Sequence, residues 1–404
     1  MELVRRRRMS AEVSGRPRRV LLISPFPPPN DGIGEHTRNL AEAWLAEGAD
    51  VLVLSRGSAV SSERECEGTV QVARCLHPIK RRSSRQVVDT FRPDFVLCQF
   101  AVSALTTVLP AAIDACRRAR AHGAVIAVVF HEPAREIDRL GPFGPRLYRR
   151  VADVADFAIA LSTAAGEALA DSGVARRIVQ VAVGVPPSVP VSREDIERVR
   201  RSYNLGDSLV VLSMGFIHSD KGLDTLLEAA PIVNARVAQP LRFVVAGAPR
   251  GRRGLFKPLG WVDARLDRSL RARAGMPDQR GRFTFVGFVP RADVAPLLAS
   301  AAVFVLAYTK TTQSAIAADV LASGTPMVAT FLPGLVEALD GAAVYAPPGN
   351  ASQLAERVID VLTDADLGNR LRAASLEHGA AHRFSQVVRD IGAAAFPSEM
   401  DGRT

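Results

Sequence analysis

The chain lacks most of the features that mark secreted and membrane-spanning proteins. It has four cysteines among 404 residues, and no two of them are spaced as C-x-x-C. We therefore expect Cys66, Cys75, Cys98 and Cys116 to be free thiols, with Cys98 buried in a strand, rather than disulfides or metal ligands. No apolar run is long enough to span a bilayer, and the basic N-terminal stretch is not followed by the apolar core of a secretory signal.

Aromatic and acidic residues are also scarce. Aromatics make up 6% of the chain, and 42 Asp and Glu stand against 51 Lys and Arg. A basic surplus favours anionic partners such as nucleotides, sugar phosphates and acidic lipids. No basic stretch with interleaved aromatics and no nucleic-acid-binding module is present, so nucleic acid is not an expected partner. We expect a cytoplasmic protein, with peripheral contact to the cytoplasmic face of the membrane as an open alternative.

What the sequence does contain is a series of short Val-, Ala- and Leu-rich runs that alternate with amphipathic helical patterns. This alternation is typical of parallel sheets covered by helices, and the length suits two domains. The sequence therefore predicts an α/β protein of two facing Rossmann-like domains with a ligand cleft between them. The predicted strands are 19–24, 50–55, 94–99, 124–130, 157–161, 178–183, 209–217, 241–246, 282–289, 303–308 and 327–330.

The predicted organisation follows from where the alternation starts, breaks and restarts. A basic tail at 1–18 precedes an N-terminal Rossmann-like domain at 19–187. The segment 188–207, rich in proline and then in charge, is predicted to be a linker followed by a helix. A C-terminal Rossmann-like domain follows at 208–380, and a final helix and tail at 381–404 are expected to pack back towards the first domain.

The first candidate site is the glycine-containing loop between the first predicted strand and the first helix. Gly32 and Gly34 precede a helical pattern that begins at Glu35. Glycine lets the backbone approach a ligand closely, and a helix N-terminus offers amide N–H groups to an anion. The spacing is not G-x-G-x-x-G, so dinucleotide binding is not indicated, and a tight turn without a ligand is an equal alternative.

The second candidate is the loop from Gly215 to Lys221, between a strand and a helix of the second half. A cation at a helix start opposes the helix dipole unless an anion lies nearby, so Lys221 indicates an anion site; a solvated lysine is the alternative. His218 in this loop has no second histidine or cysteine at ligand spacing, so a metal site is not expected. His131 follows an apolar strand of the first half, and its residue type alone favours hydrogen bonding over catalysis.

The third candidate is the polar stretch from Thr311 to Asp319. Small polar side chains crowd the predicted turn between a strand and a helix, which suits a pyrophosphate. Asp319 lies among apolar neighbours in that helix, where a buried carboxylate needs a partner, and two ribose hydroxyls would supply one. An exposed surface aspartate is the alternative.

Together these stretches resemble the retaining glycosyltransferases of the GT-B fold, the family that includes glycogen synthases, sucrose synthases and bacterial mannosyl- and glucosyltransferases. The resemblance covers about 19–391 and is carried, in order, by GIGEHTRNLA, VVFHE, GFIHSDKGLDTLLEA, FTFVGFVPRADVAPLLASAAVFVLAY and ADVLASGTPMVAT. It implies a transferase that moves a hexose-type sugar from a UDP- or GDP-type nucleotide sugar to a glycan, glycolipid or small-molecule acceptor, with retention of configuration. The first domain would hold the acceptor and the second the donor, and no cofactor or metal is implied.

The resemblance also implies a role for each candidate residue. His131, Lys221 and Asp319 would be the catalytic-site residues. The implied contacts are Gly32 and Gly34 with the donor phosphate or sugar, His131 with the donor sugar, Gly215 and Lys221 with the pyrophosphate, Phe288 and Val289 with the nucleobase, Gln313, Ser314 and Ala315 with the phosphates, and Asp319 with the ribose.

The chain departs from the family pattern at two positions. The family usually has Glu, seven residues, then Glu; here Thr311 and Asp319 stand there, so Thr311 or Gln313 would have to contact the donor sugar. Phe216 stands where the family commonly has an arginine, which the basic stretch 250–257 could replace unless it is only a solvated loop. The alternatives are a catalytically degenerate member that binds nucleotide sugar or assists a partner glycosyltransferase, or another nucleotide-sugar enzyme such as an epimerase.

Basic clusters in the first half suggest a further partner. They are residues 5–8, residues 80–82 with Arg85, and residues 146–150. Basic residues are attracted to an anionic surface, so we expect electrostatic docking to anionic lipid close to a lipid-linked or growing glycan acceptor. A solvated basic surface and a soluble acceptor are the alternative.

Overall fold

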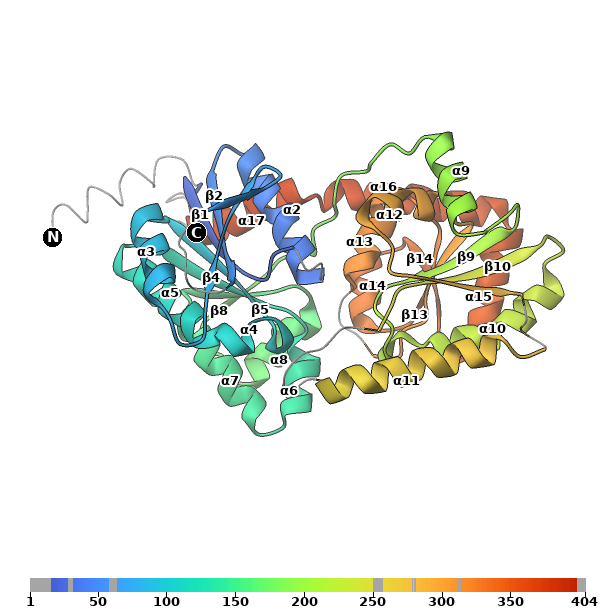
Figure 1. The fold of residues 1–404 in the computed structure, drawn as a ribbon, viewed down its shortest axis with the longest axis horizontal. Coiled ribbons are helices and arrows are strands. Elements are labelled where there is room, and N and C mark those ends of the chain that lie inside the picture. Colours follow the sequence, from blue (N-terminus) through green and yellow to red (C-terminus); the bar gives the residue numbers. More distant parts are fainter. Residues whose placement is uncertain are drawn as a thin grey trace, which may run out of the picture. The chain divides into compact units, whose positions relative to one another are not determined.

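The computed structural model describes residues 16–27, 32–57, 64–249, 257–277, 279, 281–310 and 314–397. The chain divides into two compact units, each built on its own sheet (Figure 1). The first unit runs to Gly184 and takes in the chain again from His382, and the second is Val185–Ala381. Among the described helices, none is both long enough and apolar enough to cross a membrane.

The first unit contains an eight-stranded sheet in the order β3-β4-β2-β1-β5-β6-β7-β8. Its strands are parallel except β3, which pairs antiparallel with β4. Apolar runs form the central strands of this sheet because helices cover both of its faces, so successive side chains are buried alternately on one face and the other. The strands are β1 (Arg19–Ile23), β2 (Asp50–Arg56), β3 (Glu65–Glu67), β4 (Val70–Leu76), β5 (Phe95–Phe100), β6 (Val125–Phe130), β7 (Phe157–Ala160) and β8 (Arg177–Gln180).

The helices of the first unit divide between the two faces of this sheet. The first and last helices, α2 and α17, pack together on one face, so the chain end beyond His382 completes the core of this unit. Helices α3, α5, α7 and α8 contribute to the core on the other face. The helices are α2 (Gly32–Ala46), α3 (Arg82–Phe91), α4 (Val102–Leu105), η1 (Thr106–Val108), α5 (Leu109–Ala121), α6 (Pro133–Leu140), α7 (Phe143–Ala152), α8 (Thr163–Asp171) and α17 (Phe384–Ala395).

The second unit contains a six-stranded parallel sheet in the order β11-β10-β9-β12-β13-β14. One face is covered by α9, α12, α13 and α14, and the other by α10, α11 and α15. The elements are α9 (Arg193–Ser202), β9 (Leu209–Met214), η2 (Ser219–Lys221), α10 (Leu223–Arg236), β10 (Leu241–Ala246), α11 (Lys257–Ala274), β11 (Phe283–Gly287), α12 (Arg291–Ala299), β12 (Val303–Leu306), α13 (Ala315–Ser323), β13 (Met327–Thr330), α14 (Pro333–Leu339), β14 (Ala343–Ala346), α15 (Ala351–Thr363) and α16 (Ala365–Ala381).

The prediction of two Rossmann-like α/β domains is confirmed, with differences at several element ends. Helix α2 begins at Gly32 rather than at Glu35, so Gly32 and Gly34 lie in its first turn and not in a loop before it. Strands β9 and β12 end two or three residues earlier than predicted, because their last residues turn into the loops that carry polar side chains. The segment 188–207, predicted as a linker with a helix, belongs to the second unit, where α9 packs against α12.

Candidate functional site

Two loops meet at the carboxyl ends of neighbouring strands in the second unit. One follows β9 and contains Gly215 and η2, and the other follows β12. The backbone N–H of Thr309 donates to the carbonyl of Asp220 at 2.9 Å. Gly222 has a φ of 61°, and a Cβ atom there would lie 1.8 Å from the Ala307 carbonyl oxygen. The two loops can therefore approach this closely because residue 222 is glycine.

Lys221 is held between these loops. Its Nζ donates to Tyr308 Oη at 2.5 Å and lies 3.8 Å from the centroid of the Tyr308 ring. A Cβ atom at Gly215 would lie 3.7 Å from Lys221 Nζ, so the two predicted residues are neighbours. No described carboxylate forms an ion pair with Lys221. Because the ammonium contacts a neutral hydroxyl and an aromatic ring, its charge is left to attract an anion.

The N-terminus of α13 joins the same cluster. Ser314 precedes the helix in an extended conformation, and its Oγ lies 2.9 Å from Tyr308 Oη. Ala315 is the first residue of the helix. The structure thus brings the predicted residues Lys221 and Ser314 together through Tyr308, whose side chain is 1% exposed. Tyr308 was not among the predicted site residues, because an aromatic residue at the end of an apolar strand is typical of the hydrophobic core.

Several predicted site residues lie where no structure is described. Thr311, which stands where the family has its first glutamate, and Gln313 are outside the described residues. Arg250, Arg252 and Arg253, which were considered as replacements for the missing arginine, are outside them as well.

Asp319 is neither fully exposed nor unpaired. Arg291, the first residue of α12, donates from Nη1 to Asp319 Oδ1 at 2.6 Å. Burial raises the pKa of the Asp319 carboxyl, and the opposing effect of Arg291 does not cancel it. The alternative of an exposed surface aspartate is therefore wrong. Arg291 could not be identified from residue patterns, because the two paired residues lie 28 positions apart on different helices.

The loop before α12 contains the two residues predicted to lie beside a nucleobase. Phe288 and Val289 directly follow β11. Phe288 is 59% exposed, whereas Val289 is buried in the core of the second unit. An exposed aromatic face at a strand end can stack on a planar base, while Val289 anchors the loop.

In the first unit, His131 follows β6 and contacts two other polar residues. Its Nε2 lies 2.6 Å from Gln99 Oε1, at the end of the neighbouring strand β5. The His36 ring, in α2, makes an edge contact with the His131 ring at 5.5 Å between centroids. Burial lowers the pKa of His131 to about 3, with a further contribution from His36, and burial lowers the pKa of His36 to about 4. Both rings are therefore neutral at pH 7.

Gln99 carries a hydrogen-bonding group that remains unsatisfied. Its side chain is fully buried, and Nε2 has no hydrogen-bond partner among the described residues. With Gln99 Oε1 as acceptor, His131 Nε2 carries the ring proton and Nδ1 is left as an acceptor. A buried donor without a partner costs about 1–3 kcal/mol, so the pair is suited to a ligand that can both donate and accept. Gln99 could not be identified from residue patterns, because it lies within an apolar strand.

Two further features lie close to this cluster. Glu132 follows His131 and has a φ of 51°, a left-handed conformation that costs energy for a residue with a Cβ and is concentrated at functional sites. The first turn of α2, which contains Gly32 and the buried Gly34, is on the same helix as His36. The predicted residues Gly34 and His131 are therefore brought into one region of the first unit.

No metal centre is formed by the residues that the structure describes, where no three His, Cys, Asp or Glu side chains are grouped as ligands. The four cysteines are free thiols, and Cys98 is buried in β5 as predicted. Cys66 is exposed, whereas Cys75 and Cys116 are buried.

Comparisons with known proteins follow the same division of the chain. Residues 30–189 match a family model described as Glycosyltransferase Family 4, and residues 208–364 match one described as Glycosyl transferases group 1. No curated protein sequence matches the chain significantly.

Many solved structures share the fold, at low sequence identity. Anabaena Alr3699/HepE in complex with UDP and glucose has a TM-score of 0.71 and 16% identity, over 93% of this chain and 99% of that one. Sucrose-phosphate synthase from Thermosynechococcus elongatus has a TM-score of 0.68 and 16% identity, over 93% and 98%. A UDP-forming trehalose-phosphate synthase from Burkholderia xenovorans has a TM-score of 0.67 and 15% identity, over 94% and 98%. At these identities the likeness shows the fold.

Proposed function

Because the chain is a glycosyltransferase of the GT-B fold, with a family match in each half, we propose that it moves a hexose-type sugar from a nucleotide sugar to a glycan, glycolipid or small-molecule acceptor with retention of configuration. The observation that supports this best is the cluster of Lys221, Tyr308 and Ser314 at the start of α13. It combines an ammonium, two hydroxyls and a helix N-terminus, all of which favour a phosphate. Similar structures contain UDP or UDP-glucose, so a UDP-type donor is preferred, with a GDP type second.

In the proposed transfer reaction, the main role of the protein is to stabilise the leaving diphosphate. The bond between the anomeric carbon and the phosphate oxygen breaks, and the acceptor oxygen bonds to the same carbon on the same face. The acceptor's proton passes to the departing phosphate, so no protein base is required. Lys221 and the amide groups of α13 stabilise the negative charge that develops on the phosphate, in place of a metal ion or a cofactor.

The ribose, base and sugar of the donor would be bound by side-chain groups that still have hydrogen-bonding capacity or an exposed aromatic face. Arg291 occupies one oxygen of Asp319, and the other would accept hydrogen bonds from the ribose hydroxyls. Phe288 would stack beside the base. In the first unit, Gln99 Nε2 and His131 Nδ1 would bind a sugar hydroxyl, which can accept from one and donate to the other.

A second candidate is a catalytically inactive member that binds a nucleotide sugar or assists a partner enzyme. It is supported by Thr311 and Phe216, which stand where the family has a glutamate and an arginine. A panel of UDP-, GDP-, ADP- and dTDP-sugars tests both candidates, since a bound donor raises the midpoint of thermal unfolding. Stabilisation by one donor followed by nucleoside diphosphate release with an acceptor supports the transferase, and stabilisation without transfer to any acceptor supports the second candidate. If no donor raises the midpoint, both are wrong.

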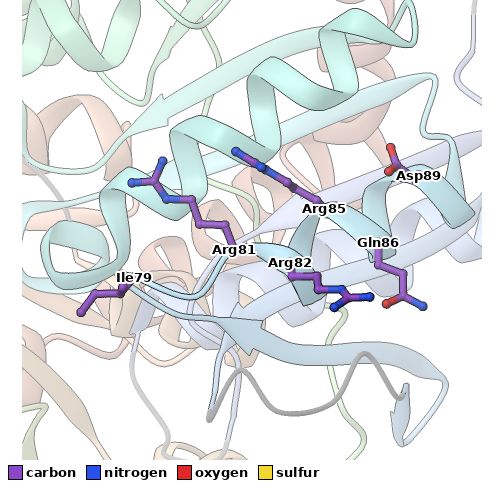
Figure 2. A pocket seen from close by; sticks show the side chains of 6 residues that line it. All are labelled: Ile79, Arg81, Arg82, Arg85, Gln86 and Asp89. Carbon is purple, nitrogen blue, oxygen red and sulfur yellow. The ribbon is translucent and has the colours of Figure 1, made fainter.

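We further propose that the first unit contacts an anionic lipid surface. A hollow of about 670 Å³ at the start of α3 is lined in part by Arg81, Arg82 and Arg85. Figure 2 shows the side chain of Arg82 pointing away from those of Arg81 and Arg85. The side chain of Ile79 beside it is 82% exposed. Arg85 donates two hydrogen bonds to the Asp114 carboxylate, from Nη2 to Oδ1 at 2.7 Å and from Nε to Oδ2 at 2.8 Å. Arg82 forms no ion pair with any described residue, so its charge remains available to a lipid headgroup.

A second basic surface lies on α7, which covers the same face of the sheet as α3. Phe143 at its start is 71% exposed. The exposed arginines of this helix that have no described ion-pair partner are Arg146, Arg149 and Arg150. Exposed apolar side chains among unpaired cations suit the boundary of an anionic membrane. The cluster at residues 5–8 is outside the described residues.

A further inference from the structure

Lys221, Tyr308 and Ser314 form a chain of hydrogen bonds in the second unit. The chain runs from Lys221 Nζ to Tyr308 Oη over 2.5 Å, and from Tyr308 Oη to Ser314 Oγ over 2.9 Å. Tyr308 and Ser314 are both buried. The tyrosine also has its backbone fixed, because Thr330 Oγ1 donates to its carbonyl oxygen at 2.6 Å. The hydroxyl of Tyr308 is therefore held in one position between a lysine and a serine.

The chemistry of the three groups sets the direction of the hydrogen bonds. An ammonium can only donate, so Tyr308 Oη accepts from Lys221. The tyrosine hydroxyl has a single hydrogen, and Ser314 Oγ is the one acceptor for it among the described residues. Because leaving a buried O–H without an acceptor is costly, Tyr308 donates to Ser314. Ser314 accepts this bond, and its own hydrogen is left for another acceptor.

Ser314 is also unusual as the residue before a helix. A serine in this position commonly accepts a hydrogen bond from an amide two or three residues later. Ser314 Oγ makes no such bond to the described residues of α13. Its hydroxyl hydrogen and the first amide groups of α13 are thus both available at the helix N-terminus, where an anion is favoured.

We propose that Tyr308 is a positioning residue for the donor diphosphate: it fixes the Lys221 ammonium and orients the Ser314 hydroxyl as a donor to a phosphate oxygen. This inference rests on the proposed function, and adds to it a residue that does not touch the substrate. Each bond in the chain polarises the next, so the Ser314 hydroxyl becomes a stronger donor than an isolated serine.

The test replaces Tyr308 with Phe, which keeps the ring beneath Lys221 and removes the hydroxyl. Tyr345→Phe is a matched control, because the buried Tyr345 hydroxyl has no hydrogen-bond partner among the described residues. Calorimetry with UDP measures phosphate-dependent binding, and competition with uridine measures binding of the nucleoside alone. We expect Tyr308→Phe to weaken UDP binding about tenfold, with uridine unaffected and the control equal to wild type.

A double-mutant cycle tests the chain itself. Ser314→Ala should weaken UDP binding by a factor similar to that of Tyr308→Phe. The double variant should be little weaker than either single variant, because each change breaks the same chain. Losses that multiply in the double variant would show that Tyr308 and Ser314 act independently and would contradict the inference.

The outcomes separate this inference from the proposed function. If wild type binds UDP and Tyr308→Phe binds it equally well, Tyr308 does not position the site, while the proposed function stands. An equal loss of UDP and uridine would mean that Tyr308 is a structural residue, which also overturns the inference. If the wild type binds none of UDP, GDP, ADP and dTDP, the proposed function fails and the inference fails with it.

Discussion

Both units place polar side chains at the carboxyl ends of neighbouring parallel strands, but the charge of these groups differs. In the first unit, the buried Gln99 and the half-buried His36 and His131 form a cluster that is neutral at pH 7. In the second unit, Lys221 brings a cation without a described carboxylate partner to the N-terminus of α13. Neutral donors and acceptors suit sugar hydroxyls, and a cation beside a helix N-terminus suits a phosphate. The difference matches the roles proposed for the two clusters, which are hydroxyl binding in the first unit and phosphate binding in the second.

The largest expected effect comes from removing the cation of the second unit. Lys221→Ala should lower turnover by about a hundredfold, since one contact that stabilises the leaving phosphate contributes about 3 kcal/mol. Lys310→Ala is the matched control, because it removes the same charge from an exposed position in the adjoining loop. Steady-state rates of nucleoside diphosphate release measure both. Equal losses in the two variants would show that net charge, and not the position of Lys221, matters.

The next effect concerns the carboxylate of the second unit. Asp319→Asn should weaken nucleoside diphosphate binding by roughly 1.5–3 kcal/mol, because an amide replaces a charged acceptor of ribose hydrogen bonds. Calorimetry would compare it with Asp207→Asn, an exposed aspartate of the same unit. Unchanged affinity in Asp319→Asn would mean that Asp319 pairs with Arg291 but does not bind the ribose.

A weaker effect is expected at the basic surface of the first unit. Arg82→Glu combined with Arg146→Glu should lower binding to phosphatidylglycerol-containing vesicles at least tenfold at low salt, because each basic residue contributes about 1 kcal/mol. Arg370→Glu changes an exposed arginine of the second unit and should leave binding unchanged. Co-sedimentation at low and high salt is the measurement. Vesicle binding that does not change with salt concentration, or no vesicle binding by wild type, would contradict electrostatic docking and would point to a soluble acceptor.

The last effect concerns the stability of the first unit rather than ligand binding, and it follows from the neutral histidines. Their pKa values are lowered from 6.5 to about 4 for His36 and about 3 for His131. Between pH 6.5 and about 4 the unfolded chain therefore binds protons that the folded first unit does not. Stability should fall as the pH drops through this window, by at most about 1.4 kcal/mol per pH unit for each histidine.

Denaturant unfolding at several pH values measures this slope. His131→Gln should make it shallower, and His77→Gln, which removes a histidine away from the cluster, should not. A slope that is the same in wild type and His131→Gln would contradict the assignment of a buried neutral ring.

The parts that could be predicted from the sequence are those set by local patterns. Strands such as β10 and β13 were predicted to the residue, because apolar runs between polar turns are fixed by their neighbours in sequence. The β3–β4 hairpin and β14 were not predicted, and for β3 the reason is that it is polar and contains no apolar run. Loop glycines and Lys221 stood out because their residue type is unusual at a strand end or a helix start.

The partners of the site residues could not be predicted in the same way. Tyr308 is joined to Lys221 across 87 residues, and Gln99 to His131 across 32. Such pairs depend on which strands become neighbours in the sheet, and residue spacing does not encode this. Both residues also lie at the ends of apolar strands, where a tyrosine or glutamine does not interrupt the pattern.

The central claim is that Lys221 and the start of α13 hold the donor diphosphate, and the most direct test is a calorimetric titration with UDP, and with GDP in parallel. Wild type and Lys310→Ala should bind one nucleotide per chain with equal affinity, and Lys221→Ala should bind it at least tenfold more weakly. Equal affinity in wild type and Lys221→Ala would contradict the claim and would place the diphosphate elsewhere.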